Sequence, residues 1–283
     1  MAINRAAEAT ILGEGAELQP EIRATPRYYL SAFLDNFVPL AFVLILWEGV
    51  ARLEVIHPAL FPTVTEIFIK MWELTLEGIF LRDVFHSLLR LLSSVFFAII
   101  VGTICGLLMG TNRWAEKVII PPLNFFLAIP GIAIFPIVIL WFGLTEKAIV
   151  FTLAFEASLS IMLNTWGGVK SVDVSLINAG RALGASGYRL FYKILIPAAL
   201  PAIITGYRQG FSRAWRILVA GEMLASIGTG IGFRIFEARA FLASDVMYAG
   251  VIVIGILGFL LERVALRSLE IFTVQRWGMV REL

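Results

Sequence analysis

Charged side chains are scarce in this sequence of 283 residues. Asp, Glu, Lys and Arg make up 16% of the chain, whereas about 25% is usual in a soluble domain. Hydrophobic residues make up 59%, and the mean hydropathy is +0.87. This excess of apolar surface predicts contact with lipid. The net charge is only +2, so no strong field would attract nucleic acid, and a nucleic-acid partner is not expected.

The residues and motifs of common catalytic and metal sites are also few. Cys105 is the single cysteine, which excludes an internal disulfide and favours a packing role. His57 and His86 have no carboxylate at metal-ligand spacing. The sequence contains no GxxxxGK[ST] phosphate loop, GxSxG elbow or HExxH helix, and the glycines of Gly228–Phe233 predict only a turn outside the membrane. We therefore expect no catalytic site, no metal and no bound cofactor.

Long apolar windows predict six membrane-spanning helices, because about 20 apolar residues cross a hydrocarbon layer of roughly 30 Å. The windows are Phe33–Leu53, Leu88–Met109, Val118–Phe142, Ala148–Trp166, Thr205–Leu224 and Tyr248–Leu266. The stretch His57–Arg90 holds too many charges to span and is expected to form a helix outside the lipid core. The predicted fold is an all-α integral membrane protein, with a transmembrane domain (33–267) between an N-terminal tail (1–32) and a C-terminal tail (268–283).

The loops between these windows differ in positive charge. If the N-terminus is cytoplasmic, the inside segments hold roughly twice as many Lys and Arg residues as the outside segments. Both termini are therefore expected in the cytoplasm, and the inverted topology is the alternative. The first thirty residues mix acidic and basic side chains without a long apolar core, so no cleavable signal peptide is expected.

Glycine and proline mark two of the windows. Gly102, Gly106 and Gly110 recur every four residues, which leaves one helical face bare enough for another helix to approach closely. That helix could belong to the same chain or to another subunit. Pro130 and Pro136 predict a kinked helix that lines a pathway, because irregular backbone inside a membrane is tolerated away from lipid.

Ionisable residues interrupt the fifth window. Arg208 and Arg216 lie about 80° apart around a helix at about 100° per residue, so they can share a face. Charged groups at depth usually face a cavity or a partner. Arg216 and Glu222 are therefore candidates for a translocation pathway or for its mouth opposite the cytoplasm, and we expect Arg216 to help an anionic solute pass. Arg208 and Arg213 line the same pathway or extend to the cytoplasmic headgroups.

The longest cytoplasmic loop runs from Lys170 to Ile196 and is too polar to span. Its alanines favour a short helix, glycines between Gly184 and Gly187 can turn the chain, and a second amphipathic helix is expected to end at Pro197. The resulting protrusion is either a docking surface for a partner or a linker that rests on the membrane.

This loop resembles the signature of permeases of bacterial binding-protein-dependent ABC importers, which is EAA, three residues, Gly, nine residues, Ile, one residue and Leu-Pro. The spacing matches at Asn178, Ala179, Gly180, Gly184, Ile194, Ile196 and Pro197, with Ala182 and Ala185 between them. Asn178 stands where the signature has glutamate, and Gly180 where it has alanine. The resemblance covers about His57 to Trp277 and is similar to the nitrate, sulfonate, taurine and bicarbonate branch.

The resemblance implies a type I importer permease in a bacterial inner membrane. It implies a homodimer, two cytoplasmic ATPase subunits that bind ATP and dock on the loop around Gly184, and a solute-binding protein outside that delivers a small anionic solute. An ion-driven secondary transporter or channel is the main alternative, since it would need no docking loop. An intramembrane enzyme is disfavoured by the missing catalytic motifs.

Overall fold

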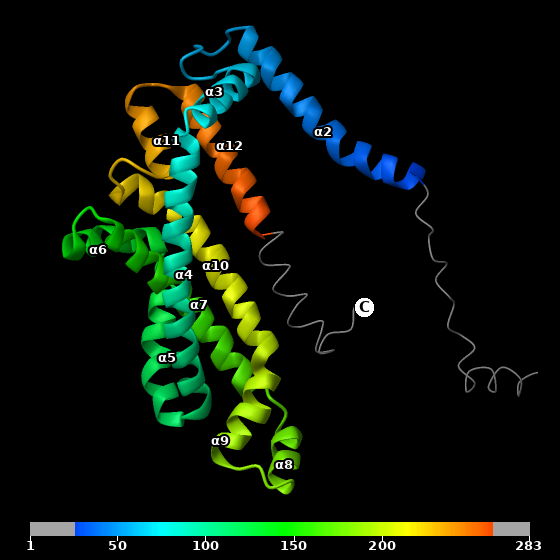
Figure 1. Ribbon diagram of the computed structural model, residues 1–283, viewed down its shortest axis with the longest axis vertical. Helices are drawn as coiled ribbons and strands as arrows, with labels where there is room; N and C mark the ends of the chain where they lie inside the picture. Colours follow the sequence, from blue (N-terminus) through cyan, green and yellow to red (C-terminus); the bar gives the residue numbers. More distant parts are fainter. Residues whose placement is uncertain (1–25, 263–283) are drawn as a thin grey trace, which may run out of the picture. The chain divides into compact units, whose positions relative to one another are not determined.

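The computed structural model describes residues 26–262, with the side chains of residues 26–37 left out, and this part of the chain is helical without strands. The chain divides into two units at Val55 and Ile56. The first contains α2 (Pro26–Arg52), which includes all but the last residue of the predicted span Phe33–Leu53. Most of the two predicted tails lies outside the described residues. The second unit holds the remaining helices (Figure 1).

A short helix and a long one open the second unit. Thr63 caps α3 (Val64–Leu76) in a capping box with Glu66, which satisfies free backbone N–H groups at the start of the helix. α4 (Ile79–Thr111) begins nine residues before the predicted span, so the last part of His57–Arg90 belongs to the same continuous helix, and its place outside the lipid core stays a prediction. Asp83 and Arg90 of this part are paired with residues of other helices, as described below.

The third predicted span, Val118–Phe142, is broken. α5 (Arg113–Leu127) and the pair η1 (Gly131–Ile134) and α6 (Phe135–Phe142) meet at 98°. Pro130 caps η1, and Pro136 lies in the first turn of α6, where proline is tolerated. The predicted kink is therefore confirmed.

The broken segment runs from one end of α7 (Glu146–Lys170) to the other. Near its start, Glu116 accepts hydrogen bonds from Trp166 and Lys170 in the last turns of α7, at 3.2 and 2.7 Å. Its end at Phe142 leads directly into the first turn of α7. The segment therefore crosses the bundle instead of returning to the side from which it came.

The predicted glycine face packs within the chain. A Cβ atom on Gly102, Gly106 or Gly110 of α4 would lie 2.5–2.7 Å from side-chain atoms of Ile161, Thr165 and Val169 on α7. Of the two interpretations, the structure thus shows close packing inside one chain.

A third helix, α10 (Ile196–Ala225), packs against both α7 and α4, and Thr103 of α4 forms a 3.0 Å hydrogen bond with Tyr207 of α10. Gly210 of α10 faces Ile161 of α7, and the core where α4, α7 and α10 meet includes Leu91, Leu153 and Leu218. The three helices form the frame on which the candidate site is built.

The last elements are α11 (Ile231–Ala240) and α12 (Ser244–Leu260). In the described residues, three helical stretches are long and apolar enough to cross a membrane: 79–111, 146–170 and 187–225. The bent pair α5 and α6 gives a fourth, and α12 is a shorter apolar helix in the sixth predicted window. The described part of that window ends before Leu266.

Candidate functional site

The predicted cytoplasmic loop forms two helical pieces, as expected. Asp173 caps α8 (Val174–Ala182) by accepting a hydrogen bond from the Ser175 N–H at 2.8 Å, and this bond lowers the pKa of the Asp173 carboxyl. At the other end the Ala185 and Gly184 N–H groups donate to the Gly180 and Arg181 carbonyls, both at 2.9 Å. This pattern is a Schellman motif. Gly184 has φ +82°, which explains the glycine there.

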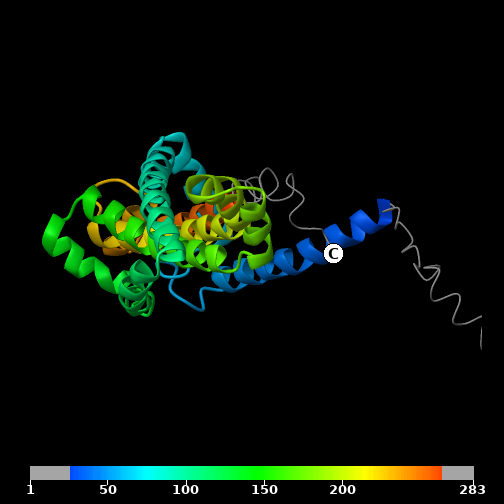
Figure 2. The ribbon, with the colours of Figure 1, turned by 90° about the horizontal axis from the view of Figure 1, so that it is seen from below.

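The second helical piece does not end at Pro197. α9 (Gly187–Leu190) continues through a π-helical turn, η2 (Phe191–Leu195), into α10, and Pro197 lies in the first turn of α10. The loop is therefore a rigid continuation of a membrane helix on its α9 side. Figure 1 places α8 and α9 at the lower end of α10, and Figure 2 shows the same segment in yellow-green from below.

The contact between α8 and η2 explains one departure from the importer signature. A Cβ atom on Gly180 would lie 2.1 Å from Cδ1 of Ile194. Gly180 is the buried residue of α8, and Ile194 is half-buried against it. The missing methyl group lets the two pieces pack more closely than alanine would.

This loop exposes large apolar side chains. Leu183 is 89% exposed, Tyr188 73% and Val174 66%, and we call these three residues the docking surface. Among the predicted site residues, three on α8 are exposed: Asn178, Ala179 and Ala182. Four others are half-buried behind it: Ala185, Ile194, Ile196 and Pro197. Exposed apolar side chains on a protruding element are typical of a protein interface.

Polar residues of α10 line a cavity of about 410 Å³, which we call the arginine cavity. Its lining contains the predicted pair Arg208 and Arg216, together with Arg213. The other lining residues are Ser160, Thr205, Gln209, Ser212 and Glu262. Three guanidinium groups and one carboxylate make the lining positive, so it favours an anion. Neither predicted proline, Pro130 or Pro136, is among these residues.

Two arginines of this cavity, Arg213 and Arg216, contact oxygen atoms of the protein. Arg216 donates from Nε to the Ser212 carbonyl of its own helix at 3.1 Å, a bond that leaves its two terminal amino groups available. Arg213 Nη1 lies 3.4 Å from Oε2 of the buried Glu156 on α7. Arg216 therefore has terminal amino groups that can bind a solute.

Glu222 lies in a buried cluster and does not line the arginine cavity, and its place on the pathway or at its outer mouth stays a prediction. Its Oε1 accepts hydrogen bonds from Ser87 at 2.7 Å and from Arg90 at 2.6 Å, and its Oε2 accepts one from the Gly232 N–H at 2.9 Å. Arg90 also pairs with Glu146 at the start of α7. The cluster therefore joins four helices that are far apart in the sequence: α4, α7, α10 and α11.

The glycine-rich run Gly228–Phe233 belongs to this cluster. Its turn ends at Gly230, where φ is +112°, and Ile231 then begins α11, so only its first half is the predicted turn. Arg90 donates to the carbonyl and hydroxyl oxygens of Thr229 at 3.0 and 2.9 Å. The Gly230 N–H donates to Asp83 at 3.1 Å. The turn thus serves to hold the buried charges of α4.

Sequence reasoning missed Asp83 and Arg90 as cluster residues. Asp83 also pairs with Arg234 of α11 at 2.9 Å. The sequence did contain a signal for them. Both residues lie in the apolar helix that follows Gly78, and a charged side chain in such a helix needs a partner. It missed Thr205, Gln209 and Ser212 too, although their spacing of three to four residues places them on the same helical face as the arginines.

Comparison with known proteins gives a consistent family match. Residues 84–271 match the family described as binding-protein-dependent transport system inner membrane component. The taurine transport system permease protein TauC of Escherichia coli (strain K12) is 32% identical over 236 residues, which cover 82% of this chain and 85% of TauC. The putative aliphatic sulfonates transport permease protein SsuC of the same strain is 31% identical, over 84% of this chain and 90% of SsuC.

A third relative and a solved structure extend the match. The nitrate import permease protein NrtB of Synechocystis sp. (strain PCC 6803) is 35% identical over 64% of this chain and 66% of its own. A chain of the MetNI methionine ABC transporter in an inward-facing conformation has a TM-score of 0.59 at 21% identity, covering 69% of this chain and 97% of that one. The structural likeness supports the fold, and the sequence relatives support the family.

Proposed function

This chain belongs to the family of binding-protein-dependent transport system inner membrane components, and from that premise we propose that it forms the path of a small anion through an ABC importer. The chain is the membrane-spanning permease subunit, with the type I importer fold. The proposal concerns its solute, its partners and its orientation.

The observation that carries the proposed solute is the arginine cavity. Three arginines of one helix share it with one carboxylate, and hydroxyl and amide groups complete its lining. Such a set binds sulfonate or nitrate oxygens through charge-assisted hydrogen bonds. The names of the relatives agree in chemistry, since sulfonates and nitrate are anions and taurine carries a sulfonate group. A solute that must also leave needs weak binding, which a solvated cavity provides.

The proposed partners follow from the docking surface and from the family. Val174, Leu183 and Tyr188 would contact one of two ATPase subunits, which bind ATP and drive the cycle. A second copy of this permease would complete the path as a homodimer, and a solute-binding protein would deliver the anion on the opposite side. The docking surface and both termini would lie in the cytoplasm. The membrane that the chain crosses would be the inner membrane of a bacterium.

The loop around Gly184 would transmit motion between ATPase and membrane. α9 and η2 run into α10 without a break, so displacement of the docking surface moves the helix that carries all three arginines. Coupling through such a continuous element is physically plausible because helices resist bending over a few turns.

Transport by the reconstituted complex tests the proposed solute. Proteoliposomes with the permease, its ATPase and its binding protein should take up labelled taurine, an alkanesulfonate or nitrate only when ATP is hydrolysed. Arg216→Gln should lower the uptake by roughly tenfold or more, because a hydrogen bond to a charged group contributes about 1.5–3 kcal/mol. Arg216→Lys, which keeps the charge, should lose less.

Two results would contradict the proposal. Equal uptake by wild type and Arg216→Gln, in complexes of equal stability, would remove Arg216 from the path. Uptake that persists without ATP and follows an ion gradient would indicate a secondary transporter. Arg239→Gln serves as the control for a lost surface charge, because Arg239 lies on α11 and does not line the arginine cavity.

A further inference from the structure

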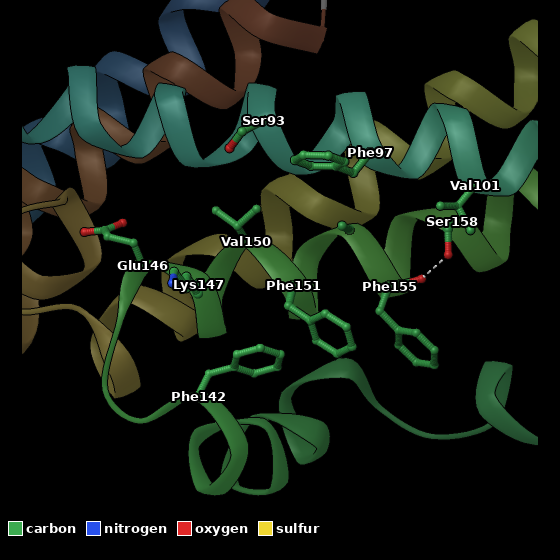
Figure 3. A pocket seen from close by; sticks show the side chains of 11 residues that line it. Ser93, Phe97, Val101, Phe142, Glu146, Lys147, Val150, Phe151, Phe155 and Ser158 are labelled. Carbon is green, nitrogen blue, oxygen red and sulfur yellow. Dashed lines mark hydrogen bonds between the residues drawn. The ribbon is translucent and has the colours of Figure 1, made fainter.

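An apolar groove of about 650 Å³ lies between α4 and α7, away from the arginine cavity. Figure 3 shows that Phe97 and Val101 project into it from α4, Phe151 and Phe155 from α7, and Phe142 from the end of α6. The ring centroids of Phe142 and Phe151 are 5.2 Å apart, and those of Phe151 and Phe155 are 6.4 Å apart. These rings form one continuous wall along the groove.

The two serine hydroxyls in the depth of the groove already use their donor hydrogens within the chain. Ser93 and Ser158 are its polar residues there. The Ser93 hydroxyl donates to the Leu89 carbonyl at 2.7 Å, and the Ser158 hydroxyl donates to the Phe155 carbonyl at 2.7 Å. Because a polar group without a partner is costly to bury, the groove favours a purely apolar chain.

The mouth of the groove has a different character. Glu146 and Lys147 line it at the first turn of α7. Arg90 pairs with the Glu146 carboxylate, with Nη2 and Oε1 2.5 Å apart, and shares its charge between Glu146 and the buried Glu222. Lys147 is exposed and forms no ion pair among residues 38–262. The mouth therefore presents one ammonium group with no ion-pair partner of its own, beside an apolar slot.

We propose that this groove is a phospholipid-binding site, with an acyl chain between α4 and α7 and the lipid phosphate against Lys147. A groove with an apolar depth and an unpaired ammonium group at its mouth is complementary to an amphiphile whose head carries a phosphate. Lys147 and Ser158 are eleven residues apart on α7, about 16 Å at 1.5 Å per residue, which suits much of an acyl chain. The volume is within the roughly 300–1,000 Å³ range of ligand pockets.

The position of the groove gives the lipid a structural role. It opens at the end of α7 where Arg90 joins α4, α7 and α10, opposite the docking surface. A bound chain would fill space that separates α4 from α6 and the start of α7. The site is thus independent of the proposed solute and of the arginine cavity.

Photolabelling of the assembled complex tests the site. The probe is a phosphatidylglycerol with a diazirine in its acyl chain, in vesicles of phosphatidylethanolamine and phosphatidylglycerol. Label should be found in peptides of 93–101 and 142–158. Ala154→Phe, which places a ring in the groove, should lower labelling there by about tenfold or more, because several methylene groups lose their buried contacts. Lys147→Gln should lower phospholipid retained through purification, measured by native mass spectrometry.

Matched variants separate this site from general lipid contact. Val251→Phe adds the same ring to an exposed position of α12, and Lys117→Gln removes an exposed lysine at the other end of the bundle. Both should label and retain lipid as wild type does. Wild-type labelling spread evenly over all spans would overturn the proposal whether or not the variants fold. So would unchanged labelling in Ala154→Phe, or loss of the dimer in that variant, which would make the groove a subunit interface.

Discussion

Gly180 shows how a single missing methyl group sets the fit between two parts of the docking loop. It is buried on α8, directly opposite the Cδ1 methyl of Ile194 in η2. The contact is with the flexible end of a side chain, so a small change at either residue can be absorbed by the other. The sequence pattern identified both positions through the importer signature. Their contact could not be predicted, since it depends on how the loop folds back on itself.

We expect Gly180→Ala and Ile194→Val to be non-additive. Alanine favours the helix by about 1 kcal/mol over glycine but here meets Ile194, so the single variant should change stability little or reduce it. Ile194→Val removes that methyl and should recover the helix preference in the double variant. Thermal unfolding of the purified complex would measure a coupling of about 0.5–3 kcal/mol. Simple addition of the two effects would contradict the contact.

At the scale of elements, α4 differs most from its prediction. Counting charges placed the chain before Leu88 outside the lipid core, yet α4 starts at Ile79. The partners that neutralise Arg90 and Asp83 are Glu222 and Arg234, which are 132 and 151 residues away in sequence. A prediction from a short sequence window cannot detect partners so far away in the sequence. The helices in the second to fifth apolar windows and the proline kink were predictable because their signals are local.

Breaking the buried cluster should cost far more than breaking an exposed pair. Arg90→Met would leave Glu222 buried without its cation, and we expect a loss of about 3–5 kcal/mol in the free energy of unfolding. Arg52→Met, which removes an exposed pair with Glu48, should cost less than about 1 kcal/mol. Thermal or denaturant unfolding in detergent compares the two. Equal losses would mean that the cluster does not hold the helices together.

At the scale of the whole molecule, α10 links the proposed functional parts. The docking loop leads into its first turn, the arginine cavity lies along its middle, and Glu222 near its end joins the buried cluster. The order of these parts along one helix could be read from the sequence. Which of its charged side chains face a cavity could not be predicted from the sequence. Arg216 and Glu222 differ in the residues that pack around them in space and not in the sequence pattern around them.

The proposed orientation places the two ends of α10 on opposite sides of the membrane. In a Cys105→Ala background, Asn178→Cys on α8 should react with a membrane-impermeant maleimide only from the cytoplasm. Leu242→Cys, between α11 and α12, should react only from outside, and both positions are exposed. Right-side-out and inverted vesicles measure this directly. The reversed pattern would establish the inverted topology, and labelling of both from one side would contradict the crossing by α10.

The π-helical turn η2 constrains how this loop can change in length. A π turn usually holds one residue more than an α turn over the same rise. Deleting one residue from Phe191–Leu195 would therefore restore a regular α-helix and leave everything before it in nearly the same orientation around the axis of α10. Deleting one residue from the first α-helical turn of α10 would instead rotate the loop by about 100°. The docking surface would then face a different direction with every side chain that composes it intact, and it would fit only an ATPase whose groove had turned with it.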